Sequence, residues 1–281
     1  MRLEPSLVIM VLAAFVGGCG NGAPSKKAFI TEADAICKPA TDAALALTTP
    51  GDFVSLRQFH LTLADRADET VGAVEKLRFP GGADGEAARG WVKSVRDASG
   101  TARQVVKDVD LANYAAVEAG ATNVIGSFQA ADSQARAFGF AECGRGDADV
   151  VGRMAKALPK AVKEAFVQAV NEVCRSAAVE IERLQTPKTL PEFKTRLDEA
   201  TVIEEKAVTG IKAIAAPSTD KALLDELVAA MEAVMSHYKE MAGAVAANRP
   251  IASLSDKSEE IRNKASAAAR GFGAYQCSRL V

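Results

Sequence analysis

Recognised catalytic and cofactor motifs are absent from this sequence. It has only two His residues, His60 and His237, and neither belongs to an HExxH or Glu-x-x-His pattern. There is no CxxC or CxxCH pair, no phosphate-binding loop and no GxGxxG fingerprint. These absences argue against haem, zinc-protease, di-iron and nucleotide sites. The sequence therefore predicts no catalytic residue, no cofactor-binding residue and no metal ligand, and we expect a protein that is not an enzyme.

An excess of charge of one sign is also missing. Lys and Arg number 34 and Asp and Glu number 36, which gives a net charge of −2. Without a basic stripe, we expect no nucleic-acid partner. Aromatic residues make up only 5%, with Trp91 as the single Trp, but the hydrophobic fraction of 48% is enough for a packed core. Because Ala is frequent and is the strongest helix former, the composition favours helices.

Long hydrophobic runs are missing too, apart from one at the N-terminus. Residues 7–16 read LVIMVLAAFV, and these ten apolar residues are too few for a membrane-spanning helix, which needs about 20. Arg2 is the only positive residue before this run, and Gly-Gly-Cys19 follows it. The arrangement is typical of a targeting segment and not of the folded protein.

Small residues directly before Cys19, after such a run, resemble the lipobox of bacterial lipoproteins. The resemblance implies that residues 1–18 are a signal peptide and that Cys19 carries a diacylglyceryl lipid. The alternative is an ordinary signal peptide with an incidental Cys. Residues 19–26 then form the lipidated tether, of which the part after Cys19 spans at most ~25 Å. We expect an exported protein that is lipid-anchored to a bacterial membrane and faces the periplasm or the cell exterior.

An internal repeat organises the rest of the chain. Residues 28–37 and 165–174 read AFITEADAIC and AFVQAVNEVC, and residues 137–145 and 271–279 read AFGFAECGR and GFGAYQCSR. The Phe and Cys positions agree within each pair, and the two pairs stand in the same order. The sequence therefore predicts two copies of one domain.

The repeat sets the expected domain boundaries at residues 27–144 for copy one and 161–281 for copy two, with a linker at 145–160. Helical periodicity and Pro or Gly breaks predict four helices in each copy, and no useful alternating strand pattern appears. Short connections between antiparallel helices favour an up-down bundle. We expect an all-α fold of two tandem four-helix bundles.

Several helix ends follow from Pro, Gly and capping residues. In copy one, breaks are expected at residues 49–51 and 80–82 and near 119–121, and Pro39 should kink or end the first helix. In copy two, Ser218 is expected to cap the third helix, and the fourth helix should run from about Ser253 to Cys277.

The five Cys residues fit one lipid site and two disulfides. If Cys19 carries lipid, four remain, and four Cys allow three pairings. The repeat selects Cys37–Cys143 and Cys174–Cys277, because each copy then joins its first helix to its last. Export would place these thiols in an oxidising compartment. A metal or redox role is the alternative, and the absence of a CxxC pair disfavours it.

A Met-rich helix and two Ser-x-x-Lys pairs are weaker candidates for a chemical site. Soft thioethers suit Cu(I), and one predicted helix carries Met231, Met235, His237 and Met241. Their helical angles spread too widely to surround one ion, so Met231 and Met235 are expected in the core.

Ser-x-x-Lys occurs from Ser218 and from Ser236, without the Ser-Asp-Asn and Lys-Thr-Gly partners that penicillin-binding enzymes need. The adjacent acids Glu204 and Glu205 are expected to be solvated.

The layout of the mature chain resembles uncharacterised exported lipoproteins of actinobacterial type with tandem, disulfide-clasped helical domains. The pattern is a Phe before the first Cys of each copy, a Leu/Ile-x-x-Pro break and a lone Cys near the end. Its positions here are Phe29, Cys37, 77–80 and Cys143, then Phe166, Cys174, 214–217 and Cys277. The resemblance implies fold and location only.

Two functions remain open from the sequence. The first is a non-enzymatic binding or scaffolding module of the cell envelope, held at the membrane through a lipid on Cys19, with an unidentified envelope protein as partner. The second is a periplasmic carrier or sensor of a small apolar ligand or a metal ion, bound between the helices. An apolar cavity in the fold would favour the second.

Overall fold

The computed structural model describes residues 22–145 and 147–280 of the 281-residue chain. The predicted signal peptide, residues 1–18, and the predicted lipid site, Cys19, lie outside the described residues. The described chain is all-α, as expected, and none of its residues is in a strand. Its helices are α1 (Lys26–Leu45), α2 (Phe53–Val74), α3 (Gly82–Asp110), α4 (Tyr114–Phe138), α5 (Asp147–Glu182), α6 (Leu190–Ala213), α7 (Lys221–Ala246), α8 (Ala252–Phe272) and the 3₁₀-helix η1 (Cys277–Arg279).

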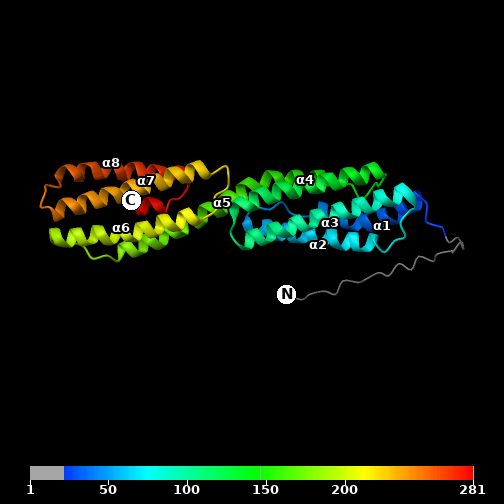
Figure 1. Cartoon of the computed structure of the whole chain (residues 1–281), viewed down its shortest axis with the longest axis horizontal. Helices are drawn as coiled ribbons and strands as arrows, with labels where there is room; N and C mark the ends of the chain where they lie inside the picture. Colours follow the sequence, from blue (N-terminus) through cyan, green and yellow to red (C-terminus); the bar gives the residue numbers. More distant parts are fainter. Residues whose placement is uncertain (1–21, 146, 281) are drawn as a thin grey trace.

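The molecule is elongated, and its helices form two groups that lie end to end (Figure 1). We call α1 to α4 the first half, and α6 to α8 with η1 the second half. α5 belongs to both, because it contacts α1, α2 and α4 in the first half and α6 and η1 in the second. The two halves therefore share one long helix.

Most of the segment expected as a linker, residues 145–160, is helical. α5 runs without interruption through most of that segment, from Asp147 to Glu182. Pro159 lies inside it, as Pro39 lies inside α1, so neither proline ends its helix. An apolar stripe on the first part of α5 is buried, which offsets the roughly 3 kcal/mol that an internal proline costs. The stripe consists of Val150, Val151, Met154 and Leu158.

The break expected near residues 119–121 is wrong. α3 and α4 are separated instead at residues 111–113, where the side chain of Asn113 accepts a hydrogen bond from the amide of Ala116 and caps α4. Gly120 lies inside α4, where a side chain would come within 2.9 Å of Val105 on α3. Glycine here permits close helix packing and does not end the helix.

Aromatic side chains connect the cores of the two halves. Tyr114, at the start of α4, has its ring centre 5.2 Å from that of Phe53 and 5.6 Å from that of Phe166 on α5. Phe166 in turn meets Phe272 of α8 edge to face at 5.5 Å. These residues belong to one hydrophobic cluster that continues through both halves. The junction is therefore a packed core and not a hinge loop.

Polar contacts at the same junction correct the role expected for Ser218. Ser218 does not cap the third helix of its half, because α7 begins after Asp220. The backbone amide and hydroxyl of Ser218 donate instead to the Glu118 carboxylate of α4, at 2.8 and 2.9 Å, and the Thr219 hydroxyl donates to it at 3.4 Å. The buried carboxylate of Asp220 pairs with Lys163 of α5 at 2.8 Å. The loop before α7 is thus fastened to the first half.

Both predicted disulfides are confirmed. Cys37 is bonded to Cys143, with Cα atoms 4.9 Å apart, and Cys174 to Cys277, with Cα atoms 4.8 Å apart. The second Cys of each pair was expected on the last helix of its copy. It lies instead in the segment that follows that helix. Cys143 follows α4, and Cys277 is in η1.

Each of these segments begins at a glycine that reverses the chain. Gly139 and Gly273 take left-handed φ angles of 107° and 92°, which favour glycine because it has no Cβ. The amide of the following residue bonds back to the carbonyl five residues earlier, at 3.0 and 2.8 Å. The repeated Phe-Gly pair is therefore a helix end that turns the chain back towards its cysteine partner.

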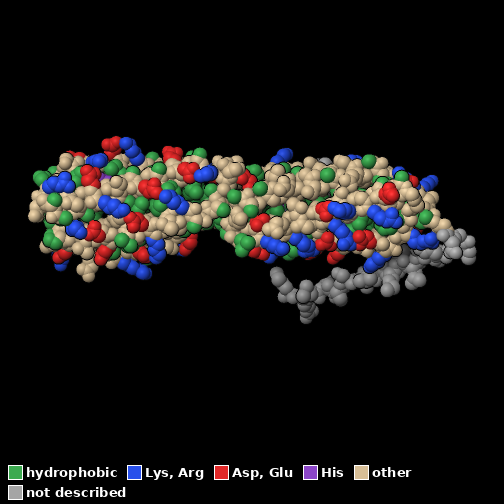
Figure 2. All heavy atoms as spheres, in the orientation of Figure 1, with side chains coloured by type: hydrophobic (Ala, Val, Ile, Leu, Met, Phe, Trp, Pro, Cys, Tyr) green, Lys and Arg blue, Asp and Glu red, His purple; other side chains and the backbone are tan. Residues whose placement is uncertain are grey.

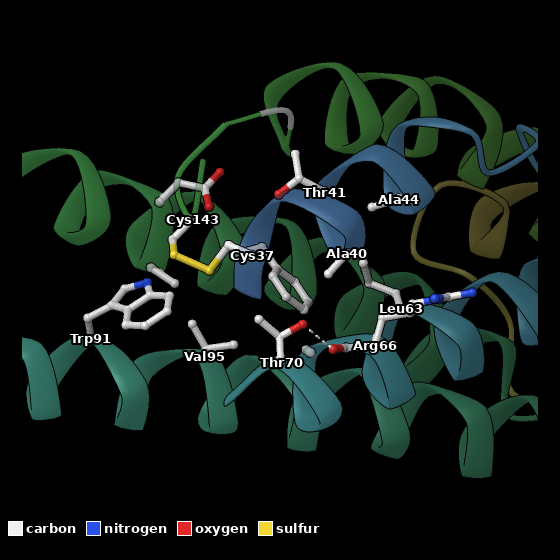
Figure 3. A pocket seen from close by; sticks show the side chains of 14 residues that line it. Cys37, Ala40, Thr41, Ala44, Leu63, Arg66, Thr70, Trp91, Val95 and Cys143 are labelled. Atoms are coloured by element: carbon white, nitrogen blue, oxygen red, sulfur yellow. Dashed lines mark hydrogen bonds between the residues drawn. A yellow bond between two sulfur atoms is a disulfide. The ribbon is translucent and has the colours of Figure 1, made fainter. Parts of the chain in front are cut away.

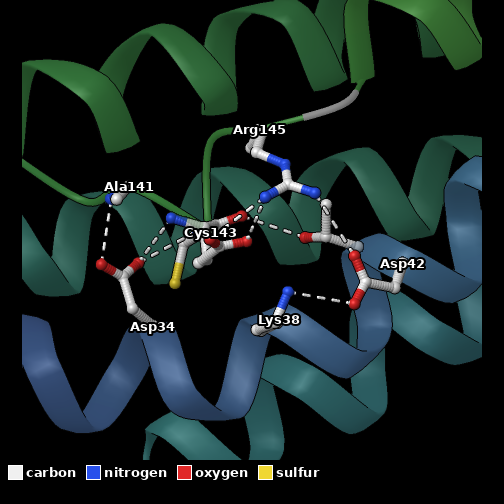
Figure 4. A network of polar contacts seen from close by, with 8 residues as sticks. Asp34, Lys38, Asp42, Ala141, Cys143 and Arg145 are labelled. Carbon is white, nitrogen blue, oxygen red and sulfur yellow. Dashed lines mark hydrogen bonds and ion pairs between the residues drawn. The ribbon is translucent and has the colours of Figure 1, made fainter.

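In each half, a short side chain on the helix that carries the first Cys of the disulfide binds the segment that leads to the second Cys. The Asp34 carboxylate accepts hydrogen bonds from three consecutive backbone amides ending at Cys143, at 3.0, 2.9 and 3.2 Å (Figure 4). At the matching position of the repeat, the Asn171 side chain accepts from the amide of Gln276 at 2.8 Å and donates to the carbonyl of Gly273 at 3.3 Å. The sequence analysis missed this contact, although both residues stand three places before a Cys.

Removing the Asp34 contact should weaken the first half. Asp34→Ala leaves three backbone amides without their acceptor, and we expect a loss of about 1–3 kcal/mol in the free energy of unfolding. Asp34→Asn should cost less, because Asn171 already performs the same role. Guanidinium unfolding of both variants measures the difference. Equal losses of unfolding free energy for Asp34→Ala and Asp34→Asn would contradict a stabilising role for these hydrogen bonds.

The surface is mixed in charge. On the face shown in Figure 2, basic and acidic side chains are interspersed along both halves, without one large patch of either sign. Many form exposed pairs within one helix, such as Lys93–Asp97 at 2.8 Å. In the part of the chain that the structure describes, no helix is long and apolar enough to cross a membrane.

Candidate ligand pocket around Glu204

A pocket of about 340 Å³ opens between the helices of the second half. It is formed by the end of α5, the first part of α6, the last part of α7 and the first part of α8, so it lies towards the end of the molecule farthest from α1 (Figure 1). Its volume falls within the range of about 300–1,000 Å³ that is typical of small-molecule sites. The polar residues that line it are Arg196, Glu204, Tyr238, Ser255, Ser258 and Arg262.

The carboxyl group of Glu204 is the most deeply buried polar group of this pocket. Its side chain is 1% exposed, and neither carboxyl oxygen has a hydrogen-bond partner among the described residues. Burial raises the pKa of Glu204 to about 8. At neutral pH the group is therefore mainly a neutral acid, which can both donate and accept a hydrogen bond.

The burial of Glu204 contradicts the expectation that it is solvated with Glu205. α6 presents a buried stripe at helical spacing that includes Leu197, Ala200, Ala207 and Ile211, and Glu204 falls on that stripe. Glu205 is exposed and pairs with Lys239 of α7 at 2.6 Å. Helical periodicity could have identified Glu204 as an acid on a core-facing position.

Tyr238 and two arginines complete the polar side of the pocket. Burial raises the pKa of Tyr238 to about 12, the charge of Glu204 adds to this, and Arg262 and Arg196 oppose it. Arg196 is held in place because its Nη1 donates to the carbonyls of Leu184 and Gln185, at 2.7 and 3.0 Å. The pocket thus combines a buried acid with two cationic groups.

His237 is buried behind the wall of the pocket that Ser258 forms. Its Nε2 is 2.6 Å from the hydroxyl of Ser258, which also lies 3.4 Å from the sulfur of Met241. Met231 and Met235 are buried in the main hydrophobic cluster, as expected, whereas Met241 belongs to a separate small cluster. The four do not converge. Among the described residues, no group of three or more His, Cys, Asp or Glu side chains could hold a metal ion.

A second, smaller cavity lies beside the Cys37–Cys143 disulfide (Figure 3). Trp91 and Thr70 also line it, and its volume is about 80 Å³. Trp91 is 2% exposed, its ring centre lies 4.9 Å from that of Phe140, and its Nε1 has no partner among the described groups. Because a water molecule occupies about 30 Å³, this cavity suits two or three waters and is too small for most ligands.

A wider hollow of about 500 Å³ between α6 and α7 has its charges already paired. Lys212 pairs with Glu232 at 2.5 Å, and Lys239 with Glu205 at 2.6 Å. Ser236 also lines this hollow, and the lysine of its Ser-x-x-Lys pair, Lys239, is the one that pairs with Glu205. The Glu204 pocket is therefore the stronger candidate, because its buried acid has no partner.

Comparison with known proteins identifies no relative. No protein-family model matches this chain, and neither the curated proteins nor the solved structures include a match. The case for a functional site accordingly depends on the geometry of the pocket.

Proposed function

We propose that this chain is a non-enzymatic, lipid-anchored binding module of the bacterial cell envelope that holds a ligand pocket away from the membrane. In this proposal, two copies of one disulfide-clasped four-helix unit are joined through α5, and a lipid on Cys19 provides the anchor. The first copy lies beside the membrane, and the second carries the Glu204 pocket. The chain would thus belong with the actinobacterial-type lipoproteins that its sequence resembles.

The position of the first described residues supports this orientation. The carbonyl of Gly22 accepts a hydrogen bond of 3.1 Å from Arg78, which stands between α2 and α3. That connection lies at the outer end of the first half, and the pocket lies towards the outer end of the second (Figure 1). α5 alone has 36 residues, which corresponds to about 54 Å of helix. A tether that contacts the fold at Gly22 would keep the pocket well away from the lipid attachment point.

The packed junction supports a spacer role. Continuous α5, the ring contacts of Tyr114 with Phe166, and the hydrogen bonds of Glu118 to Ser218 all restrict bending between the halves. The disulfides fit the same location, because such bonds persist mainly outside the reducing cytosol.

The observation that carries the binding role is the buried, unpartnered carboxyl group of Glu204. Leaving such a group without partners costs stability, and a hydrophobic residue would pack there without that cost. A strongly shifted pKa in a pocket is typical of functional residues. A ligand that hydrogen-bonds to Glu204 would account for its position.

Two measurements test the two parts of this proposal. Mass spectrometry of the N-terminal peptide from bacterial cells should show a lipid on Cys19, which Cys19→Ser should lack. A thermal-shift screen of the full-length protein with small metabolites should find a compound that raises the Tm of the wild type more than that of Glu204→Gln. At a ligand concentration of about 100 Kd the stabilisation is about 2.7 kcal/mol. An unmodified Cys19 would contradict the anchor, and a screen without such a compound would contradict the pocket.

A further inference from the structure

We propose that the Glu204 pocket binds a small zwitterion, whose ammonium group contacts the Glu204 carboxylate and whose anionic group lies at Arg196 and Arg262. A short apolar group on the same ligand contacts the pocket wall. This inference rests on the proposed function, because it names the class of ligand for the same pocket.

The buried end of the pocket favours a positively charged hydrogen-bond donor. Both oxygens of Glu204 lack a partner among the described residues. An ammonium group offers three N–H donors, and an ionised carboxylate accepts several hydrogen bonds. Hydrogen bonds between such charged groups are roughly twice as strong as neutral ones. An ammonium group therefore satisfies Glu204 better than a hydroxyl or amide group of similar size.

The two arginines favour a negative charge on the same ligand. Arg262 is exposed and makes no hydrogen bond or ion pair with any described residue. Arg196 uses Nη1 for two backbone carbonyls, which leaves the other donors of its guanidinium group for a ligand. Guanidinium groups bind carboxylates through paired N–H donors. A purely cationic ligand would be repelled by both arginines, so a zwitterion fits the whole pocket better.

The remaining wall is apolar and the volume is small. The apolar side chains that also line the pocket are those of Ile181, Phe193, Leu197, Met241 and Leu280. A volume of about 340 Å³ lies near the lower end of the range for small-molecule sites, about 300–1,000 Å³. An amino acid with an aliphatic side chain has the required size, charges and apolar body.

Proton release should accompany this mode of binding. Burial raises the pKa of Glu204 to about 8, so the free protein holds a proton there that an ammonium group displaces at neutral pH. The other ionisable groups that line the pocket are Tyr238 from α7, Arg262 from α8 and Arg196 from α6, while the described part of α5 contributes Ile181. Burial raises the pKa of Tyr238 to about 12, so Tyr238 keeps its proton near neutral pH.

One further ionisable group lies behind the wall. His237 contacts Ser258 and lies 3.6 Å from the exposed Glu240. Any contribution of this pair to the pH dependence is common to the wild type and to Glu204→Gln. Comparison of the two proteins therefore isolates the proton on Glu204.

Three matched ligands test the inference by isothermal titration calorimetry of the full-length protein. L-Leucine has both charged groups, 3-methylbutylamine lacks the carboxylate, and 4-methylpentanoate lacks the ammonium group. We expect leucine to bind most tightly and the acid most weakly. Below a pH of about 8, the affinity for leucine should rise about tenfold per pH unit, with release of about one proton.

Variants separate the two ends of the pocket. Glu204→Gln should weaken leucine binding about 10–100-fold and remove its pH dependence. Arg262→Gln should weaken binding of leucine but not of the amine. Glu205→Gln is the matched control, because Glu205 is exposed and pairs with Lys239 outside the pocket, and it should change neither affinity.

The inference is overturned if 4-methylpentanoate binds as tightly as leucine, or if Glu204→Gln keeps the affinity and its pH dependence. It is also overturned if none of the three ligands binds. In that last case, the metabolite screen decides separately whether the pocket binds another class of compound, so failure of the zwitterion is distinct from failure of the proposed function.

Discussion

Replacement of Cys174 and Cys277 by Ala is expected to lower the free energy of unfolding by about 4–5 kcal/mol. The bonded residues are 103 positions apart, and closing a loop of about 100 residues contributes about 4.7 kcal/mol in the chain-entropy model. That is a large share of the roughly 5–15 kcal/mol that stabilises a typical domain. Guanidinium unfolding followed by far-UV circular dichroism measures the change.

The first disulfide supplies the comparison. Cys37 and Cys143 are 106 positions apart, so their replacement by Ala should cost a similar amount. Because one hydrophobic cluster continues from α2 to α8, both variants should still unfold in a single transition. A loss below about 1 kcal/mol for either variant would contradict the role of the loops. Two separate transitions would contradict the shared core.

Glu204→Gln is expected to be more stable than the wild type at alkaline pH, by an amount on the order of 5 kcal/mol. Burial raises the pKa of Glu204 to about 8 in the folded protein, whereas the pKa of an unperturbed Glu is about 4.3. Between these values, the folded protein keeps a proton that the unfolded chain has lost. The stability contributed by this group is therefore greatest at acid pH and falls as the pH rises towards 8.

The difference between variant and wild type should thus be small near a pH of about 4, grow by about 1.4 kcal/mol per pH unit, and level off above the folded-state pKa. Thermal or guanidinium unfolding over this range measures it. Glu205→Gln should follow the wild-type profile, since Glu205 is exposed. Parallel profiles for Glu204→Gln and the wild type would show that Glu204 is not held neutral by burial.

Local patterns were enough to predict most helices and both disulfides. Repeated Phe and Cys positions selected the pairs Cys37–Cys143 and Cys174–Cys277, because only that choice makes the copies alike. Proline and glycine were less reliable. Pro39 and Gly120 lie inside helices, because packing against neighbouring helices outweighs the local preference of each residue.

The candidate pocket was not predicted, and Glu204 shows why. The residue stands at a spacing that places it on the buried stripe of α6, yet its charge and its neighbour Glu205 suggested a solvated pair. Whether an acid on that stripe has a partner depends on which side chains α7 and α8 bring against it. In this protein they bring Tyr238, Ser258 and Arg262, and none of them bonds to the carboxyl oxygens.

The amino-acid sequence by itself determined the helical class, the positions of most helices and the pairing of the cysteines. Periodicity and turn residues are local signals, and the repeat is visible when two parts of the same chain are compared. Only the tertiary structure decided that α5 joins the halves, that Ser218 contacts Glu118 and that Glu204 is buried without a partner. These features depend on contacts between residues distant in the chain, and their energies are set by the neighbours that folding brings together.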